Sequence, residues 1–184
     1  MAAALKQNMT VDEFLVWSTT QPGRFELFCG AVYAMSPERA GHATVKYAVQ
    51  TELARAIKEA GLPCFMLPDG MTVRISEDTA HEPDALVYCG PRVPRDTVEI
   101  KNPMIVVEVL SPSTRHIDAS AKLVSYFLVP SIQHYLIVDP EPERRPSILH
   151  SRQSDGSFLT TIIRSGTVRL DPPGLQLNIQ SFFD

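Results

Sequence analysis

The stretch MIVVEVLSPST, residues 104–114, places one acid, Glu108, inside an otherwise apolar run. A run of this kind is typical of a strand that is buried on both faces. Removing an ionised carboxylate from water costs several kcal/mol of free energy unless something compensates the charge. The sequence therefore predicts that a compensating partner lies beside Glu108.

A second acid, Asp84, begins the preceding apolar segment, EPDALVYCG. Because side chains alternate along a strand, Glu108 shares a face with Val106, and Asp84 shares a face with Leu86. If the two strands pair, the two carboxylates converge at one edge of the sheet. Close carboxylates repel each other unless a proton or a cation lies between them, and their hard oxygen atoms favour Mg²⁺.

A lysine follows on the next segment, DASAKLVSYF. Asp118, Lys122 and Tyr126 are spaced by four residues, so they lie on one face of the helix predicted there. On the side that faces the sheet, the Lys122 ammonium would offset the charge of the acid pair. It could also hold an attacking water or stabilise the charge that develops on a phosphate. A metal ion and Lys122 are thus the predicted partners of Glu108.

The rest of the sequence predicts the elements that position these side chains. Apolar periodicity predicts helices at about 11–17, 42–60 and 116–128. Alternating or continuous apolar segments predict strands at 25–28, 31–35, 84–88, 104–110, 134–139, 147–151, 158–164 and 167–170. Residues 63–75 predict one strand, or two around Asp69-Gly70.

These elements predict an α/β (α+β) fold. From residue 42 to 139 the order is helix, strand, strand, strand, helix, strand. A helical crossover between the strands at 104–110 and 134–139 makes them parallel neighbours. The predicted architecture is a mixed sheet between helices, with an N-terminal hairpin and C-terminal antiparallel strands.

Composition excludes several classes of protein. The 184 residues, of which 44% are hydrophobic and 21% charged, suit one globular domain spanning 1–184. No apolar run approaches the ~20 residues of a membrane span, and the first residues lack the apolar segment of a signal peptide. The formal net charge of −4 argues against a protein that coats nucleic acid, but less against an enzyme with a local basic groove.

The three cysteines give no pairing signal. Cys29, Cys64 and Cys89 are far apart in the sequence and odd in number. Their spacing indicates neither a disulfide framework nor a zinc ribbon. A reducing cytoplasm is therefore the expected compartment.

In combination, the segments EPDALVYCG, MIVVEVLSPST, DASAKLVSYF and HYLIVDP resemble the Uma-type restriction endonucleases, a bacterial family within the PD-(D/E)XK nuclease superfamily. The likeness covers about residues 25–140, well over half of the chain. It implies a restriction-endonuclease-like core of order α-β-β-β-α-β, the order predicted above. It also implies that Asp84 and Glu108 are catalytic metal ligands and that the cofactor is Mg²⁺ or Mn²⁺.

The sequence departs from the plain superfamily motif at Leu110, where the motif has a lysine. In the Uma-type family the lysine lies on the following helix, and Lys122 matches that position as the third catalytic residue. Glu26 and His42 match places where the family has polar residues near the pocket, so both are weaker site candidates. Asp118 and Tyr126 are further weaker candidates, whose role could be only to order Lys122.

Each assignment has a purely structural alternative. Asp84 can simply begin a strand, and Glu108 can form a structural ion pair with Lys122. Taken alone, Lys122 would be a solvated helix residue. His42 would be an ordinary residue of a helix N-terminus, and Glu26 an exposed hairpin residue.

The preferred interpretation is a metal-dependent endonuclease that hydrolyses phosphodiester bonds, with DNA as the expected partner. Arg92, Arg95 and Arg115, in predicted loops, are candidates for contacts with the nucleic-acid backbone, and a solvated surface is their alternative. A catalytically silent nuclease-like fold that binds nucleic acid or a protein stays open, as does a hydrolase of another phosphoester. The sequence does not decide the oligomeric state, and a homodimer is one of the states it allows.

Overall fold

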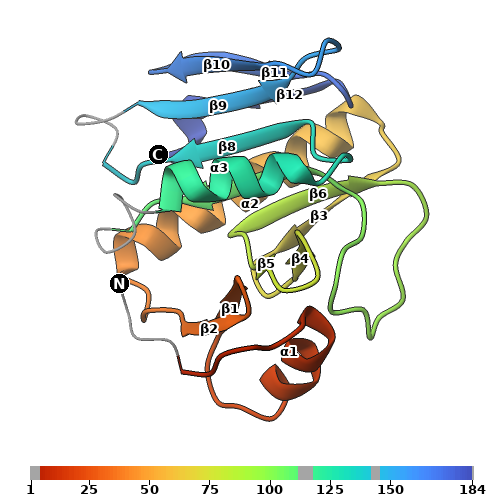
Figure 1. Cartoon of the computed structure of the whole chain (residues 1–184). Helices are drawn as coiled ribbons and strands as arrows, with labels where there is room; N and C mark the ends of the chain where they lie inside the picture. The colour runs from red at the N-terminus through yellow and green to blue at the C-terminus, as the bar shows by residue number, and fades with distance from the viewer. Residues whose placement is uncertain (1–4, 112–117, 142–145, 184) are drawn as a thin grey trace.

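A six-stranded mixed sheet organises the computed structural model, which describes residues 5–111, 118–141 and 146–183. The strand order is β10-β9-β8-β7-β6-β3 (Figure 1). The strands are β3 (Cys64–Pro68), β6 (Ala85–Cys89), β7 (Pro103–Val109), β8 (His134–Val138), β9 (Ser147–Arg152) and β10 (Phe158–Ile163). Strands β7 and β8 are parallel, and the other neighbours are antiparallel.

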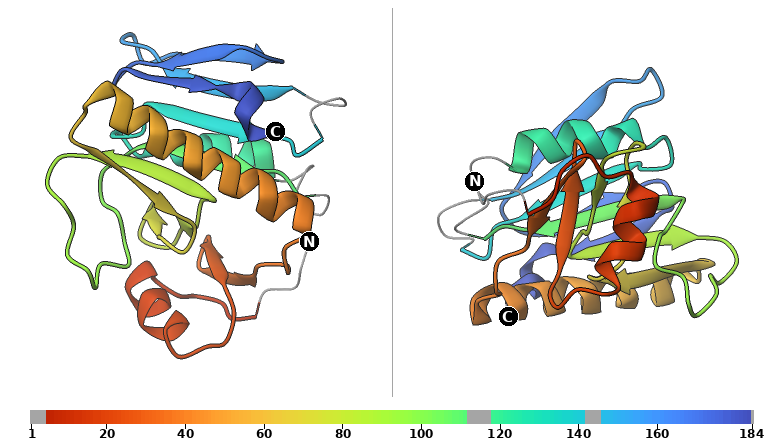
Figure 2. Two further views of the ribbon diagram at one scale, coloured as in Figure 1. Left: turned by 180° about the vertical axis from the view of Figure 1, so that it is seen from behind. Right: turned by 60° about the horizontal axis from the view of Figure 1, so that its bottom comes forward.

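Two helices, α2 (Ala40–Ala60) and α3 (Asp118–Leu128), cover opposite faces of this sheet (Figure 2). Because side chains alternate, Val87 packs on the α2 side and Leu86 on the α3 side. Both faces of the central strands are therefore buried, which explains their continuous apolar runs. Within the described ranges, no helix has the length and apolarity that crossing a membrane requires.

A smaller sheet, of order β2-β1-β5-β4, lies below the main sheet in Figure 1. Its strands are β1 (Phe25–Phe28), β2 (Ala31–Ala34), β4 (Val73–Arg74) and β5 (Ala80–His81). Helix α1 (Val11–Ser18) packs on it through Phe14, against Leu27 and Val32. A third unit, of β11 (Thr167–Leu170), β12 (Leu175–Asn178) and the 3₁₀ helix η1 (Ile179–Phe182), joins the core on the α2 side.

Local sequence explains where the first two helices begin or end. Thr10 caps α1, because its Oγ1 accepts a 3.3 Å hydrogen bond from the Glu13 N–H while Glu13 accepts one of 2.9 Å from the Thr10 N–H. Helix α2 ends at Gly61, whose φ of 62° lies in the left-handed region that glycine adopts without strain. The end of α2 at Gly61 is the end predicted from the sequence.

The predicted fold class and the order of the core elements are confirmed. The segment 63–75 forms two strands, β3 and β4, on either side of Asp69-Gly70. The short strand β5 and the terminal strand β12 were not predicted as separate elements, since each is too short for a clear alternation. The predicted start of the last helix, at residue 116, lies outside the described residues, within which α3 begins at Asp118.

Two of the three cysteines pair, although their spacing in the sequence does not indicate a disulfide. Cys64 and Cys89 are joined by a disulfide, while Cys29 is free and exposed. The two bonded residues lie directly opposite each other in the antiparallel register of β3 and β6. Strand register, rather than sequence spacing, brings them together.

Candidate active site

Asp84 and Glu108 lie where β6 begins and β7 ends. Ala85 is opposite Val107 in the antiparallel register, so the residue before Ala85 is next to the residue after Val107. Oδ2 of Asp84 accepts a 2.8 Å hydrogen bond from the Val109 N–H, and Asp84 is 5% exposed. The structure therefore brings the two acids together at one edge of the sheet, as the strand pattern predicts.

Helix α3 supplies the partners of Glu108. Oε1 of Glu108 accepts a 2.6 Å hydrogen bond from the Tyr126 hydroxyl and a 3.0 Å hydrogen bond from Nζ of Lys122. Burial raises the pKa of the Glu108 carboxyl to about 7, because the attraction of Lys122 offsets the loss of water only in part. The acid in the apolar run thus meets a lysine and a tyrosine spaced by one helical turn.

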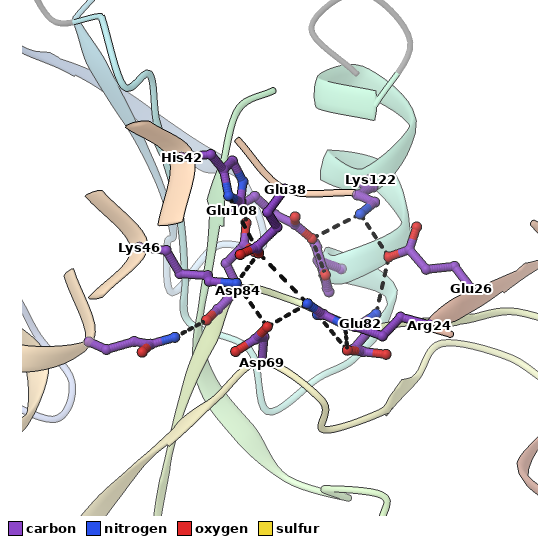
Figure 3. Close-up of polar contacts among 12 residues, drawn as sticks. Arg24, Glu26, Glu38, His42, Lys46, Asp69, Glu82, Asp84, Glu108 and Lys122 are labelled. Atoms are coloured by element: carbon purple, nitrogen blue, oxygen red, sulfur yellow. Dashed lines mark hydrogen bonds and ion pairs between the residues drawn. The ribbon is translucent and has the colours of Figure 1, made fainter. Parts of the chain in front are cut away.

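Lys122 is shared between two carboxylates (Figure 3). Its Nζ lies 2.8 Å from Oε1 of Glu26 on β1, which also accepts a 3.1 Å hydrogen bond from the Glu82 N–H. Burial alone would lower the pKa of Lys122, but Glu108 and Glu26 together raise it well above its ordinary value. Burial favours a raised pKa for Glu26, but Lys122, His81 and the Glu82 N–H together lower it below its ordinary value. Lys122 is therefore a buried ammonium that stays charged.

His42 reaches the same edge from the first turn of α2. Its Nε2 lies 2.8 Å from the Val109 carbonyl oxygen and 3.6 Å from Oδ2 of Asp84. Its Nδ1 lies 3.5 Å from Oε1 of Glu38. Contact with Asp84 raises the pKa of His42 above its ordinary value. Both weaker candidates, Glu26 and His42, therefore lie in the cluster, and neither is an exposed surface residue.

A charged network that sequence reasoning missed borders these residues (Figure 3). Arg24 donates hydrogen bonds of 2.6 Å to Glu82 and 2.5 Å to Asp69. Lys46 lies 2.9 Å from Asp69 and contacts Glu38. This second set of ion pairs links residues next to β1 and β5 of the smaller sheet with α2 and with the turn after β3.

A spacing signal for part of this network is present in the sequence. His42 and Lys46 are four residues apart on one face at the start of α2, and Glu38 stands four residues before His42, just ahead of the helix. Arg24 stands two residues before Glu26, which places both on one side of an extended chain. No such spacing marks Asp69, which lies in the turn after β3.

Two of the predicted nucleic-acid-binding arginines, Arg92 and Arg95, are not in the cluster. Arg92 and Arg95 lie in the exposed loop after β6, at the opposite end of this strand from Asp84 (Figure 1). The Arg92 guanidinium lies 4.6 Å from the centroid of the Phe65 ring. Arg115 lies outside the described residues, as does the side chain of Asp118.

The family model of Uma2, described as "putative restriction endonuclease", matches residues 11–181. The chain belongs to the Uma2 family. An uncharacterized protein of Synechocystis sp. (strain ATCC 27184 / PCC 6803 / Kazusa) is 30% identical over 152 residues, which cover 82% of this chain and 78% of the relative. The crystal structure of a protein from Anabaena variabilis ATCC 29413, described as "a putative nuclease belonging to DUF820", has a TM-score of 0.73. The match covers 95% of this chain and 97% of the Anabaena chain at 17% sequence identity, so this likeness shows the fold alone.

Uma2 membership confirms the family resemblance inferred from the four sequence segments. In this Uma2 chain Leu110, at the place of the plain-motif lysine, donates a 2.8 Å backbone hydrogen bond to Val138 and packs in the core on the α3 side. Position 110 is thus part of the apolar packing, and Lys122 brings the ammonium to Glu108 from the helix instead.

The donor set of this Uma2 site fits a divalent cation. The cluster contains the cations Arg24, Lys46 and Lys122 and the carboxylic acids Glu26, Glu38, Asp69, Glu82, Asp84 and Glu108. Carboxylates outnumber permanent cations, so added positive charge would be stabilised there. The hydrogen bonds described for the acid pair use one oxygen of each carboxylate, Oδ2 of Asp84 and Oε1 of Glu108. Oxygen ligands of this kind suit Mg²⁺ and Mn²⁺.

Proposed function

We propose that this Uma2 protein is a metal-dependent endonuclease that hydrolyses phosphodiester bonds in DNA. Asp84, Glu108 and Lys122 are the proposed catalytic residues. The observation that carries the proposal is that a buried lysine from α3, which stays charged, contacts Glu108 where Glu108 and Asp84 lie next to each other at one sheet edge. A structural ion pair needs only one acid and one base, whereas the cluster at this edge contains several more carboxylic acids than cationic side chains.

Asp84 and Glu108 are the proposed ligands of Mg²⁺ or Mn²⁺. A divalent cation in such a site supplies a Lewis acid for a phosphate oxygen and lowers the pKa of a bound water. Asp84 is oriented by the Val109 N–H and Glu108 by Tyr126. Two acids held in this way need little reorganisation when they bind an ion.

Lys122 is the proposed electrostatic stabiliser. Its ammonium is held by Glu26 and Glu108 on either side, so it is oriented before a substrate binds. There it can position the attacking water or stabilise the negative charge that grows on the phosphate in the transition state. Tyr126 orients Glu108 and thereby acts as a positioning residue rather than a catalytic one.

The substrate would reach these residues past Glu38 and Arg24. The side chains of Glu38 and Arg24 are 34% and 33% exposed, whereas that of Lys122 is 10% exposed. Arg24 is therefore a further candidate for contact with a phosphate close to the cleaved bond. Arg92 and Arg95 would contact the DNA backbone away from that bond, because they lie beyond the far end of β6.

A plasmid-nicking assay with Mg²⁺ or Mn²⁺ tests the proposal. The parent protein should nick supercoiled DNA only in the presence of the metal, and Asp84→Ala should not. Glu59→Ala removes an exposed acid at the far end of α2, away from the cluster, and serves as the control. A folded parent that binds metal but cuts no nucleic acid would instead identify a silent binding module, and one that cuts only small phosphodiesters would identify another phosphoesterase.

A further inference from the structure

Strand β10 forms an open edge of the main sheet. It is the outermost strand, at the top of Figure 1, and within the described ranges its backbone pairs with β9 alone. In an antiparallel pair every second residue directs its N–H and C=O away from the neighbouring strand. The outer side of β10 therefore presents a row of hydrogen-bonding groups with which a further strand can pair.

The side chains of β10 lack the features that usually protect such an edge. Natural edge strands are commonly guarded by charged residues, proline or a bulge. The segment FLTTII has no charged residue and no proline, and its register with β9 runs from Phe158 to Ile163 without a shift. Phe158, Leu159 and Ile162 are 46%, 55% and 64% exposed. The edge is thus regular, uncharged and apolar.

The opposite edge of the main sheet, β3, is protected. This strand ends in Pro68, and none of its other residues is exposed. The loop after β6 covers part of it, since the Gly90 N–H donates a 2.8 Å hydrogen bond to the Pro63 carbonyl oxygen and the Arg92 guanidinium lies over the Phe65 ring. Of the two edges, β10 is the one available to a partner.

The sequence of β10 is complementary to itself. Directly opposite side chains of an antiparallel pair lie on the same face, so a twofold axis perpendicular to the sheet must pass through a residue. With the axis at Thr160, Phe158 of one copy is opposite Ile162 of the other. Both side chains are on the α3 face, because the Phe158 ring lies 4.2 Å from that of Phe127 and Ile162 is opposite Ile148, which packs on that side. The exposed apolar side chains of this face would therefore cover each other.

The charges beyond the ends of β10 fit the same register. Asp155 lies in the turn before the strand and Arg164 directly follows it, and both are exposed. They are almost equally far from Thr160 along the chain, so an axis there places Arg164 of one copy beside the turn that carries Asp155 of the other. An axis at Thr161 would instead place Arg164 opposite Phe158, away from the acid. Complementary charges of this kind fix the register of an interface.

We propose that β10 is a homodimer interface, in which a second copy of this chain pairs antiparallel with β10 about Thr160. The two main sheets would then form one continuous sheet, with both α3 helices on the same face. Twofold dimers that use the same patch on both subunits are the commonest soluble oligomers. The inference is independent of the proposed function, since no residue of β10 belongs to the candidate active site.

Cysteine crosslinking tests the register in the full chain. Cys29→Ser first removes the exposed free thiol. In that background Thr160→Cys places two thiols at the axis, with Cα atoms about 5 Å apart, a separation that a disulfide spans. Mild oxidation should give a covalent dimer that a reductant reverses. Thr161→Cys is the matched control, because its thiol is opposite Leu159 of the second copy and should crosslink far less.

Light scattering after size exclusion measures association without a crosslink. At about 100 μM, above the micromolar Kd of weak interfaces, the parent should have twice the 20.4 kDa mass of the chain. Ile162→Lys should raise the dimer Kd by at least about tenfold, because two lysines would then lie at the paired edges. Val16→Lys replaces an exposed apolar residue of α1 and is the control. Thermal unfolding checks that each variant is folded.

Three results would overturn this inference. The first is a parent that has the mass of one chain and does not crosslink through Thr160→Cys, which is the result expected if β10 pairs with a strand of another protein. The second is crosslinking through Thr161→Cys rather than Thr160→Cys, which would contradict the register. The third is an Ile162→Lys protein that stays as dimeric as the Val16→Lys control, which would place the interface on another surface.

Discussion

Nζ of Lys122 lies 2.8 Å from Oε1 of Glu26, a residue 96 positions earlier in the chain. This contact joins α3, on the main sheet, to β1 of the smaller sheet. Both side chains are mostly withdrawn from water, with exposed fractions of 10% and 20%. The lysine proposed for chemistry is therefore also an ion-pair link between two parts of the fold.

Lys122→Met should lose both activity and stability. Removing the ammonium leaves Glu26 and Glu108 without their shared cation, so the free energy of unfolding should fall by about 3–5 kcal/mol. DNA cleavage should fall by roughly 10²-fold or more, because the charge of the transition state loses its stabiliser. Denaturant unfolding and the nicking assay measure the two effects separately.

The double variant Lys122→Met/Glu26→Gln separates structure from chemistry. It removes one of the unpaired carboxylates, so it should recover part of the lost stability without recovering cleavage. The Glu26→Gln single variant is the control for the second change. A Lys122→Met protein that cuts DNA at the parent's rate would exclude Lys122 from the reaction.

The acid pair and its lysine could be predicted because each depends on regular, local geometry. Asp84 and Glu108 stand on consecutive strands, where alternation and antiparallel pairing decide which side chains meet. Lys122 is only 14 residues from Glu108, across a crossover whose direction is nearly always the same. The apolar run around Glu108 signalled that a partner was required.

Most contacts of the charged network around Arg24, Lys46 and Asp69 could not be predicted, because they depend on irregular segments. Arg24 meets Asp69 across 45 residues, and Lys46 meets Asp69 across 23. These contacts depend on how the smaller sheet and the start of α2 dock on the main sheet, which no periodicity in the sequence encodes. The Cys64–Cys89 disulfide was missed for a related reason, since it requires the exact register of β3 and β6.

Glu108→Gln should stabilise the metal-free protein above neutral pH. The folded pKa of Glu108 is about 7, raised from its ordinary 4.5 by burial. Its contribution to stability is therefore full below pH 4.5 and is lost as the pH rises through 7. At about pH 8 the variant should be more stable than the parent by up to about 3 kcal/mol, because Gln keeps an oxygen for Tyr126 without the charge.

Unfolding of both proteins at acid and alkaline pH measures this effect. Near pH 4.5 the two stabilities should converge, since Glu108 is then protonated in the folded parent. Lys122 keeps Glu26 as its counter-charge in the variant. A large loss of stability in Glu108→Gln would show instead that the Glu108–Lys122 pair is mainly a structural ion pair.

Mn²⁺ should raise the melting temperature of the parent but not of Asp84→Asn. An ion that binds only the native state at about 100 times its Kd stabilises it by about 2.7 kcal/mol. For a chain of this size that corresponds to roughly 5–10 °C. Asp84 is one of the two proposed metal ligands, so its loss should remove most of the shift. Equal shifts in the two proteins would mean that the metal binds elsewhere.

His81 should make the protein sensitive to acid. The residue is 3% exposed, and its ring lies 5.3 Å from that of Tyr126 and 6.3 Å from that of Phe28. Neither ring nitrogen has a hydrogen-bond partner among the described residues. Burial lowers the pKa of His81 to about 4, so the folded protein keeps this ring neutral through most of the acid range.

The unfolded chain takes up a proton at this histidine near pH 6.5, whereas the folded chain does so only near pH 4. The contribution of the neutral His81 ring to the free energy of unfolding is therefore fully present above pH 6.5. It is lost as the pH falls through 4, by about 3 kcal/mol in total. His81→Phe keeps an aromatic ring between Phe28 and Tyr126 and cannot take up a proton. Near pH 7 the variant should be at least as stable as the parent, and near pH 4 it should be more stable by about 3 kcal/mol. Both proteins share every other titrating group, so the difference between their profiles of unfolding free energy against pH isolates His81. Parallel profiles would show that the fold does not keep the imidazole neutral.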